Sequence, residues 1–326
     1  MPSGKRSALF GGSIPAAGLH PNYQSLLGSR AHLEARNLMD ALLCEMGDPN
    51  GNFVRDFMAS GFHSRLFELG CYAYLKEAGF DIDRSHERPD FLASYNGLDV
   101  ALEASAASVQ EGNVLDISVA QMMQWPQELV DAKVYEEFPR RILSVLSRKL
   151  KKKYHLLEQC RGKALVIAVA PYYEAGSVFQ VDEALVSCLY GGIPPAGRYQ
   201  PRTPFFSMPG ADSVSAVLYC NQFTVPRFLR MAKASSGKRL NAIRTGNALI
   251  PECDGASLGE YRLDLSKGRG PKELWSQGVS VFHNPNAWVR LMSGALPCTC
   301  EFYVSGSNVI RQVGGFHTLT SFMFMF

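Results

Sequence analysis

Residues 61–105 read GFHSRLFELGCYAYLKEAGFDIDRSHERPDFLASYNGLDVALEAS and combine a helical pattern with strand-like alternation. Apolar residues recur along one side of a helix that we expect over residues 64–78, and Glu68 lies at the edge of that side. Gly79 follows as a typical residue for the C-terminal end of a helix. Residues 80–84 then alternate as a strand does. This part of the chain therefore predicts a helix that leads directly into a sheet.

The dipeptide Asn96-Gly97 predicts a β-hairpin, because it suits a two-residue turn in which both residues have positive φ. The flanking strands are expected over residues 91–95 and 98–104. If Tyr95 pairs with Leu98, the turn fixes the register of every other pair in the hairpin.

This register places Asp90 opposite Glu103. Directly opposed residues have Cβ atoms roughly 5 Å apart, and like charges in that position are destabilising. The pair therefore needs a counter-ion or a raised pKa, and a bound divalent cation would supply the counter-ion. Side chains alternate along the second strand, so Glu103 lies on the face opposite to Leu102.

A helix glutamate, the dipeptide Pro89-Asp90 and the tripeptide Glu103-Ala104-Ser105 together resemble the core of the PD-(D/E)xK nuclease superfamily. The resemblance implies an α/β fold of the restriction-endonuclease-like type, with a mixed sheet flanked by helices. It also implies that Glu68, Asp90 and Glu103 are catalytic residues and ligands of Mg²⁺ or Mn²⁺. The family's lysine would stand at position 105, where this chain has Ser105.

Two lysines are candidates to replace the one missing at position 105. A helix is expected from Pro139 to about Gln159, with proline in its first turn. On its helical wheel Lys149 and Lys153 fall within the apolar side, whereas Lys151 lies away from it. A lysine on a buried face must extend to solvent or meet an anion. We therefore expect one of the two to reach the acidic site as a catalytic residue, and the sequence does not decide between them.

The rest of the expected core alternates between strands and helices. The continuous apolar run at residues 164–170 is typical of a central strand that is covered on both faces. A helix is expected over residues 221–234, and its Arg227 and Arg230 are expected to face solvent. From about residue 235 onward the alternation of apolar and polar residues is too weak to predict regular elements with the same clarity.

The expected organisation has three parts. Residues 1–60 form an N-terminal arm and helix, residues 61–234 form the nuclease-like α/β core, and residues 235–326 form a C-terminal extension. The chain of 326 residues is 46% hydrophobic, which suits one large α/β domain or two smaller ones.

Composition sets further expectations. The net charge of +3 does not by itself indicate a nucleic-acid partner. Eight cysteines without a secretory signal pattern predict reduced thiols and a cytoplasmic location. No window approaches ~18 uninterrupted apolar residues, so no membrane span is expected.

A zinc site built from Cys298-Thr299-Cys300 with Cys253 and His283 is disfavoured, because a one-residue gap lacks the usual ligand spacing. Hard carboxylate ligands favour Mg²⁺ or Mn²⁺ instead.

The resemblance therefore implies a metal-dependent nuclease that hydrolyses phosphodiester bonds, with a nucleic acid, expected to be DNA, as its partner. Two alternatives stay open. One is a nuclease-like fold without hydrolysis that binds nucleic acid or protein, which Ser105 favours. The other is an unrelated enzyme that uses the paired carboxylates as acid and base.

Overall fold

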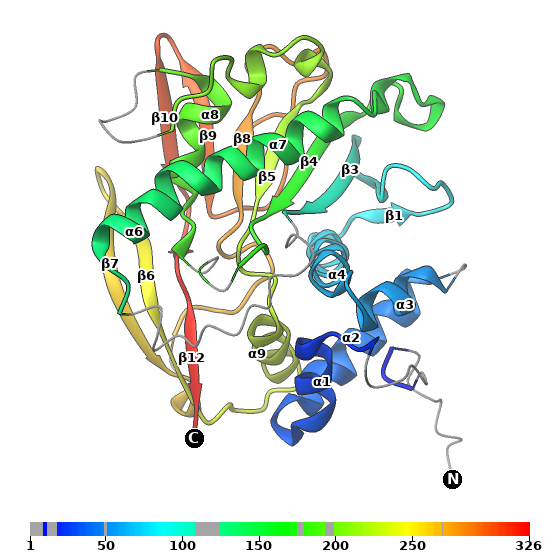
Figure 1. Cartoon of the computed structure of the whole chain (residues 1–326), viewed down its shortest axis with the longest axis vertical. Helices are drawn as coiled ribbons and strands as arrows, with labels where there is room; N and C mark the ends of the chain where they lie inside the picture. Colours follow the sequence, from blue (N-terminus) through cyan, green and yellow to red (C-terminus); the bar gives the residue numbers. More distant parts are fainter. Residues whose placement is uncertain are drawn as a thin grey trace.

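The computed structural model describes residues 9–11, 18–48, 51–107, 124–174, 176, 179–192, 199–268 and 270–326. Over these residues the chain is an α/β protein whose large mixed sheet is flanked by helices (Figure 1). Eight described strands form this sheet in the order β1-β2-β3-β4-β5-β8-β9-β10. Their bounds are β1 (Asp81–Asp83), β2 (Phe91–Tyr95), β3 (Leu98–Ala106), β4 (Ala164–Ala170), β5 (Ala216–Tyr219), β8 (Ser280–His283), β9 (Cys300–Ser305) and β10 (Asn308–Val313).

Parallel pairing is confined to two parts of the large sheet. Strands β3, β4 and β5 are parallel neighbours, and β8 and β9 form a second parallel pair. All seven residues of β4 are buried, because the strand lies in the middle of the sheet and is covered on both faces. The predicted central strand is confirmed, and it pairs in parallel with the second strand of the hairpin.

A second, smaller sheet is built around β6, which pairs with β7 along one edge and with β11 and β12 along the other. The bounds of its strands are β6 (Ala242–Glu252), β7 (Gly255–Asp264), β11 (His317–Thr318) and β12 (Phe322–Met325). In Figure 1 the labelled strands of the smaller sheet, β6, β7 and β12, lie below β8, β9 and β10 of the large one.

The helices cover both faces of the large sheet. They are α1 (Pro21–Gly28), α2 (Leu33–Met46), α3 (Asn52–Met58), α4 (Phe62–Glu77), α6 (Gln127–Ala132), α7 (Phe138–Leu150), α8 (Val186–Tyr190) and α9 (Val225–Ser235). Helix α4 packs in one hydrophobic cluster with Val100 and Leu102 of β3, whereas α7 packs in another with Ala101 of the same strand. Successive strand residues point to opposite faces, so α4 and α7 lie on opposite faces of the sheet. Among the described helices, none combines the length and apolar character needed to cross a membrane.

The predicted hairpin is confirmed in its register. Tyr95 pairs with Leu98 across the Asn96-Gly97 turn, and Phe91 pairs with Leu102. Asn96 and Gly97 both have positive φ, of 47° and 79°, as a two-residue hairpin turn of this kind requires. Strand β1 pairs antiparallel with β2, as the alternation after Gly79 predicted.

The prediction of one helix from Pro139 to about Gln159 is wrong at its C-terminal end. Helix α7 ends at Leu150, and two short 3₁₀ turns follow, at Tyr154–Leu156 and Glu158–Cys160. Lys153 adopts a left-handed φ of 52°, which turns the chain so that Tyr154 is 2% exposed. Burial of the tyrosine ring favours this turn over continuation of the helix.

The expectation that Arg227 and Arg230 face solvent is also wrong. Both lie on α9 and are buried, with exposed fractions of 0% and 4%. Their guanidinium groups form ion pairs with Glu273, which is far away in sequence.

The weakly patterned last third is rich in strands. It supplies β8, β9 and β10 to the large sheet and all four strands of the smaller one. The large sheet therefore includes strands from both sides of the boundary that the sequence suggested at residue 234.

Gly70 lets α4 approach the chain segment around Phe223. A Cβ atom added at Gly70 would lie 2.6 Å from Cγ of Phe223, which is closer than real Cβ atoms come. We expect Gly70→Ala to lower the free energy of unfolding by about 1–3 kcal/mol, the usual cost of overpacking. Urea denaturation measures this change. Gly28→Ala is the matched control, because nothing lies within 4 Å of a Cβ at that position. Equal stability of the two variants would contradict the prediction.

Candidate functional site

Glu103 and Lys149 form the centre of the candidate site. Glu103 lies on β3 on the face that α7 covers, and it is 6% exposed. Lys149, in the last turn of α7, donates a hydrogen bond from Nζ to Oε1 of Glu103 over 2.6 Å. The amphipathic pattern of α7 thus places this lysine over the sheet with its charge directed to a buried carboxylate.

Asp90 lies next to Glu103, one residue before β2 begins. Its Oδ2 accepts a hydrogen bond from the backbone N–H of Ala104 over 2.8 Å, which fixes the carboxyl beside the end of the hairpin. Burial raises the pKa of Asp90 well above its ordinary value, and the negative charges of Glu103 and Glu68 raise it further. The hydrogen bond from Ala104 and the charge of Lys149 lower this pKa but do not offset the increase.

Glu68 approaches the site from α4 and is held by two arginines. Arg65 donates to its Oε2 over 2.6 Å, and Arg84 donates to its Oε1 over 2.8 Å. Arg65 also binds Asp56 over 2.7 Å, and the guanidinium of Arg84 lies over the ring of Phe91. Glu68 is 4% exposed, so these arginines compensate for a charge that water cannot reach.

Asp90 differs from the other carboxyl groups of this site. Asp56 pairs with Arg55 and Arg65, Glu68 pairs with Arg65 and Arg84, and Glu103 pairs with Lys149. Among the described residues, Asp90 is the carboxyl group of this set that has no ion pair within 4.0 Å. Asp90 therefore has two ways to be stable: it keeps a proton, or it meets a cation.

The structure separates the two candidate lysines. Lys149 reaches Glu103, whereas Lys153 is exposed beyond the end of α7. The prediction that Lys153 shares the buried face of this helix is wrong, because the helical period stops at Leu150. Ser105 lies on β3 opposite Val169 of β4 and carries no charge.

The joint ligation of one ion by Glu68, Asp90 and Glu103 stays a prediction. The three acids are not among the groups of described His, Cys, Asp and Glu residues whose ligand atoms all lie within 4.8 Å of one another. Both carboxylate oxygens of Glu68 are engaged by arginines, so ligation by Glu68 requires an arginine to exchange for the ion. A group that does meet this criterion contains Asp182, Cys300 and His317.

Several residues of the site were not predicted from the sequence. Tyr154 is buried next to Glu103, and burial together with the Glu103 charge and hydrogen bond raises the pKa of its phenol. Gln159 donates to the backbone carbonyl of Arg88 over 2.6 Å, which ties the 3₁₀ turns to the segment before Asp90. The only sequence signal for Tyr154 was its position five residues after Lys149 in a segment expected to be helical.

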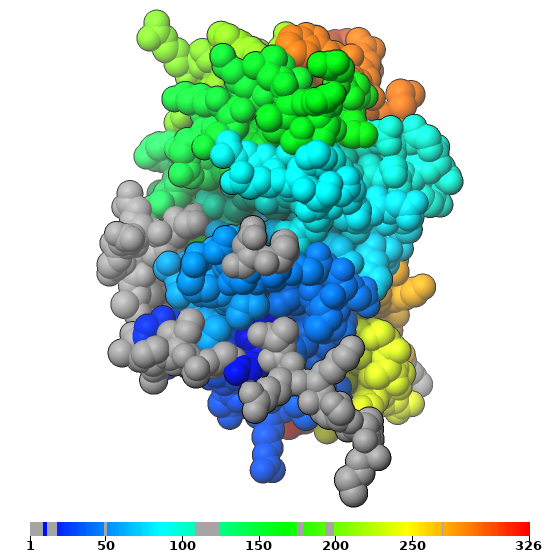
Figure 2. Space-filling view, turned by 90° about the vertical axis from the view of Figure 1, so that its right-hand side faces the viewer, coloured from blue at the N-terminus to red at the C-terminus, as the bar shows by residue number. Residues whose placement is uncertain are grey.

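Figure 2 shows where the site lies on the molecule. The segment that contains β1, β2 and β3 (cyan) is at the surface, between the N-terminal helices (blue) and the green segment that includes the end of α7. The site is therefore formed where three parts of the chain meet.

No protein-family model matches this chain, and neither curated proteins nor solved structures gave a match. A functional assignment therefore rests on the chemistry of the site.

Proposed function

We propose that this chain is a metal-dependent phosphodiesterase of the restriction-endonuclease-like type that cleaves nucleic acid, with DNA as the expected substrate. Three features support the proposal: the helix–strand–hairpin order of α4, β1, β2 and β3, the acidic pair Asp90 and Glu103, and a lysine beside that pair. The resemblance of Pro89-Asp90 and Glu103-Ala104-Ser105 to the nuclease superfamily agrees with these features.

Asp90 and Glu103 are the residues that would hold Mg²⁺ or Mn²⁺, with Glu68 as a third ligand. Carboxylate oxygens are the ligands that these ions prefer. The observation that carries the proposal is the geometry of the acidic pair: Asp90, which has no ion pair within 4.0 Å among the described residues, lies beside Glu103, which Lys149 contacts. Burial and the acidic neighbours raise the pKa of Asp90, which agrees with this geometry. A divalent cation removes this penalty by allowing Asp90 to ionise. Such an ion, when bound, lowers the pKa of a water molecule and neutralises charge on a phosphodiester.

Lys149 takes the place of the lysine that the superfamily's pattern would put at position 105, where this chain has Ser105. Its ammonium group is 2.6 Å from Glu103, so the carboxylate orients it. Placed beside a phosphodiester, this ammonium stabilises the negative charge that develops in the transition state.

Calorimetric titration with Mn²⁺ tests the site. We expect Asp90→Asn to weaken Mn²⁺ binding by at least about tenfold, because it removes a charged ligand. Mn²⁺ affinity of the unmodified protein should rise with pH, since Asp90 must lose a proton before it binds the ion. The same variant should lose Mg²⁺-dependent cleavage of labelled DNA.

Asp99→Asn is the matched control, because Asp99 lies on the same hairpin but is exposed, 4.0 Å from Lys163. It should leave Mn²⁺ binding and cleavage unchanged. If Asp90→Asn binds Mn²⁺ as tightly as the unmodified protein, the site assignment is wrong.

A second candidate function is a nuclease-like module that binds nucleic acid or protein without hydrolysis. The double pairing of Glu68 with Arg65 and Arg84 favours it, because these ion pairs already neutralise one of the three acids. Mn²⁺ binding without cleavage would support this module over the enzyme.

A further inference from the structure

A second group of metal-ligating side chains shares no residue with the acidic site and joins segments of the two sheets. Asp182 lies in a short 3₁₀ helix (Asp182–Leu185), Cys300 begins β9 of the large sheet, and His317 begins β11 of the smaller one. Their exposed fractions are 2%, 1% and 1%. Three segments that are distant in sequence thus bring an oxygen, a sulfur and a nitrogen ligand together in the interior.

The geometry of this group fits direct bonding to one ion. The ligand atoms of the three side chains lie within 4.8 Å of one another, and Nε2 of His317 is 3.0 Å from Oδ2 of Asp182. Tetrahedral zinc sites have metal–ligand distances of about 2.0–2.3 Å, which separates their ligand atoms by about 3.3–3.7 Å. Small side-chain shifts therefore convert the observed group into a coordination shell.

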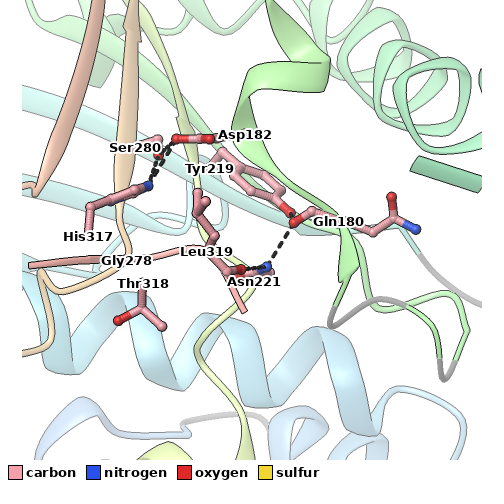
Figure 3. Close-up of a pocket in the computed structure, with 9 residues that line it drawn as sticks. All are labelled: Gln180, Asp182, Tyr219, Asn221, Gly278, Ser280, His317, Thr318 and Leu319. Carbon is pink, nitrogen blue, oxygen red and sulfur yellow. Dashed lines mark hydrogen bonds and ion pairs between the residues drawn. The ribbon is translucent and has the colours of Figure 1, made fainter. Parts of the chain in front are cut away.

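The surroundings orient the ligands. Figure 3 shows Asp182, His317 and Ser280 directed toward one another. Ser280 Oγ donates to Oδ2 of Asp182 over 2.6 Å and lies 3.5 Å from Nε2 of His317, so it is an oxygen available for a fourth position. On the other side of the ring, Nδ1 of His317 is 2.8 Å from Oγ1 of Thr299. A hydrogen bond at the distal nitrogen is the usual arrangement for a metal-binding histidine.

The convergence of these three side chains is not explained by a binding site for a substrate molecule. The pocket lined by Asp182, Ser280 and His317 has no space for a separate water-sized molecule, so an occupant must bond directly to its walls. An ion pair between Asp182 and His317 and a hydrogen bond between the Cys300 thiol and Asp182 explain these contacts without a metal. A metal ion would replace both interactions with bonds to all three side chains. A thiolate, an imidazole and a carboxylate together are ligands that zinc accepts and that Mg²⁺ does not prefer.

We propose that Asp182, Cys300 and His317 bind a structural Zn²⁺ ion that joins the large sheet to the smaller one. The Cys300 thiol loses its proton to solvent when its sulfur bonds to the metal, and His317 binds as neutral imidazole. Two anionic ligands then balance the charge of the ion in a site that water does not reach. This role is separate from the acidic site and does not depend on nuclease activity.

Metal analysis of the full-length protein tests the proposal. After expression in zinc-supplemented medium we expect about one Zn²⁺ per chain. The Co²⁺-substituted protein should show a thiolate-to-cobalt charge-transfer band. Cys300→Ser should abolish this band and weaken Zn²⁺ binding by more than about tenfold. Loss of a residue that only hydrogen-bonds a metal ligand already costs about tenfold in affinity, and loss of a ligand itself should cost more.

Two controls separate this site from other thiols and from the acidic site. Cys298→Ser removes a nearby thiol and should keep both the band and the zinc, and Glu103→Gln should do the same. X-ray absorption of the unmodified zinc protein gives an answer even if Cys300→Ser fails to fold, because one sulfur neighbour is expected. A protein that stays zinc-free after reconstitution with Zn²⁺, or a zinc spectrum without sulfur, would overturn the proposal.

Discussion

Lys149→Met should reduce Mg²⁺-dependent cleavage by about 10²–10³-fold, the usual effect of removing one group that stabilises transition-state charge. The side chain of Lys149 places its ammonium group 2.6 Å from Glu103, and methionine keeps the apolar stem but not the charge. Mn²⁺ binding should persist or tighten, because the change removes a positive charge next to Glu103, a proposed metal ligand. Single-turnover cleavage of labelled DNA, together with Mn²⁺ calorimetry, measures both effects.

Lys151→Met and Lys153→Met are the matched controls. Both lysines lie beyond the end of α7 and are exposed, so each change removes one positive charge without touching Glu103. Each should alter cleavage only slightly. Cleavage that survives in Lys149→Met would refute the role of this lysine, whereas the absence of cleavage in the unmodified protein would favour the binding module.

Glu273→Gln should lower the free energy of unfolding by about 3–5 kcal/mol, as expected when one partner of a buried ion pair is removed. Glu273 accepts from Arg227 over 3.1 Å, from Arg230 over 3.1 Å and from Arg244 over 2.9 Å. Glutamine leaves three buried guanidinium groups with no anion between them. Urea denaturation at neutral pH measures the loss, and Glu260→Gln, on the exposed side of β7, is the control.

The pH dependence of this effect has a defined sign. Burial opposes ionisation of Glu273, but the three arginines lower its pKa from 4.5 to about 2. Burial and the positive charges of Arg244 and Arg227 lower the pKa of Arg230 to about 9. The negative charge of Glu273 raises this pKa but does not offset the decrease. Because the pKa of Glu273 is lower in the folded state, its contribution is present above pH 4.5 and is lost as the pH falls toward 2. The stabilities of the two proteins should converge over that range, and a constant difference would contradict the explanation.

Local signals predicted the centre of the site well. The Asn96-Gly97 turn determines the register of the hairpin within a few residues, so the proximity of Asp90 to Glu103 follows from the sequence alone. The helical period of α7 also placed Lys149 on the sheet side. Both inferences depend on contacts between residues that are close in the chain or within one regular element.

The inferences that were wrong depend on distant contacts. No glycine or proline marks the end of α7, and the burial of Tyr154 beside Glu103 ends the helical period. Arg227 and Arg230 seemed to be surface residues because their partner, Glu273, lies more than 40 residues away. A single sequence shows which residues are charged, but it does not show which of them meet across the fold.

The strand order of the large sheet has a consequence for chain truncation. β5 pairs with β4 on one side and with β8 on the other, and β8 comes from the last third of the chain. A protein that stops at residue 234 would leave β5 as an exposed edge of four apolar residues, all of which are buried in the full chain. Such an edge offers unpaired N–H and C=O groups to any other strand, so the shortened protein would tend to self-associate through it. The C-terminal third thus protects the rest of the large sheet from aggregation as well as extending it.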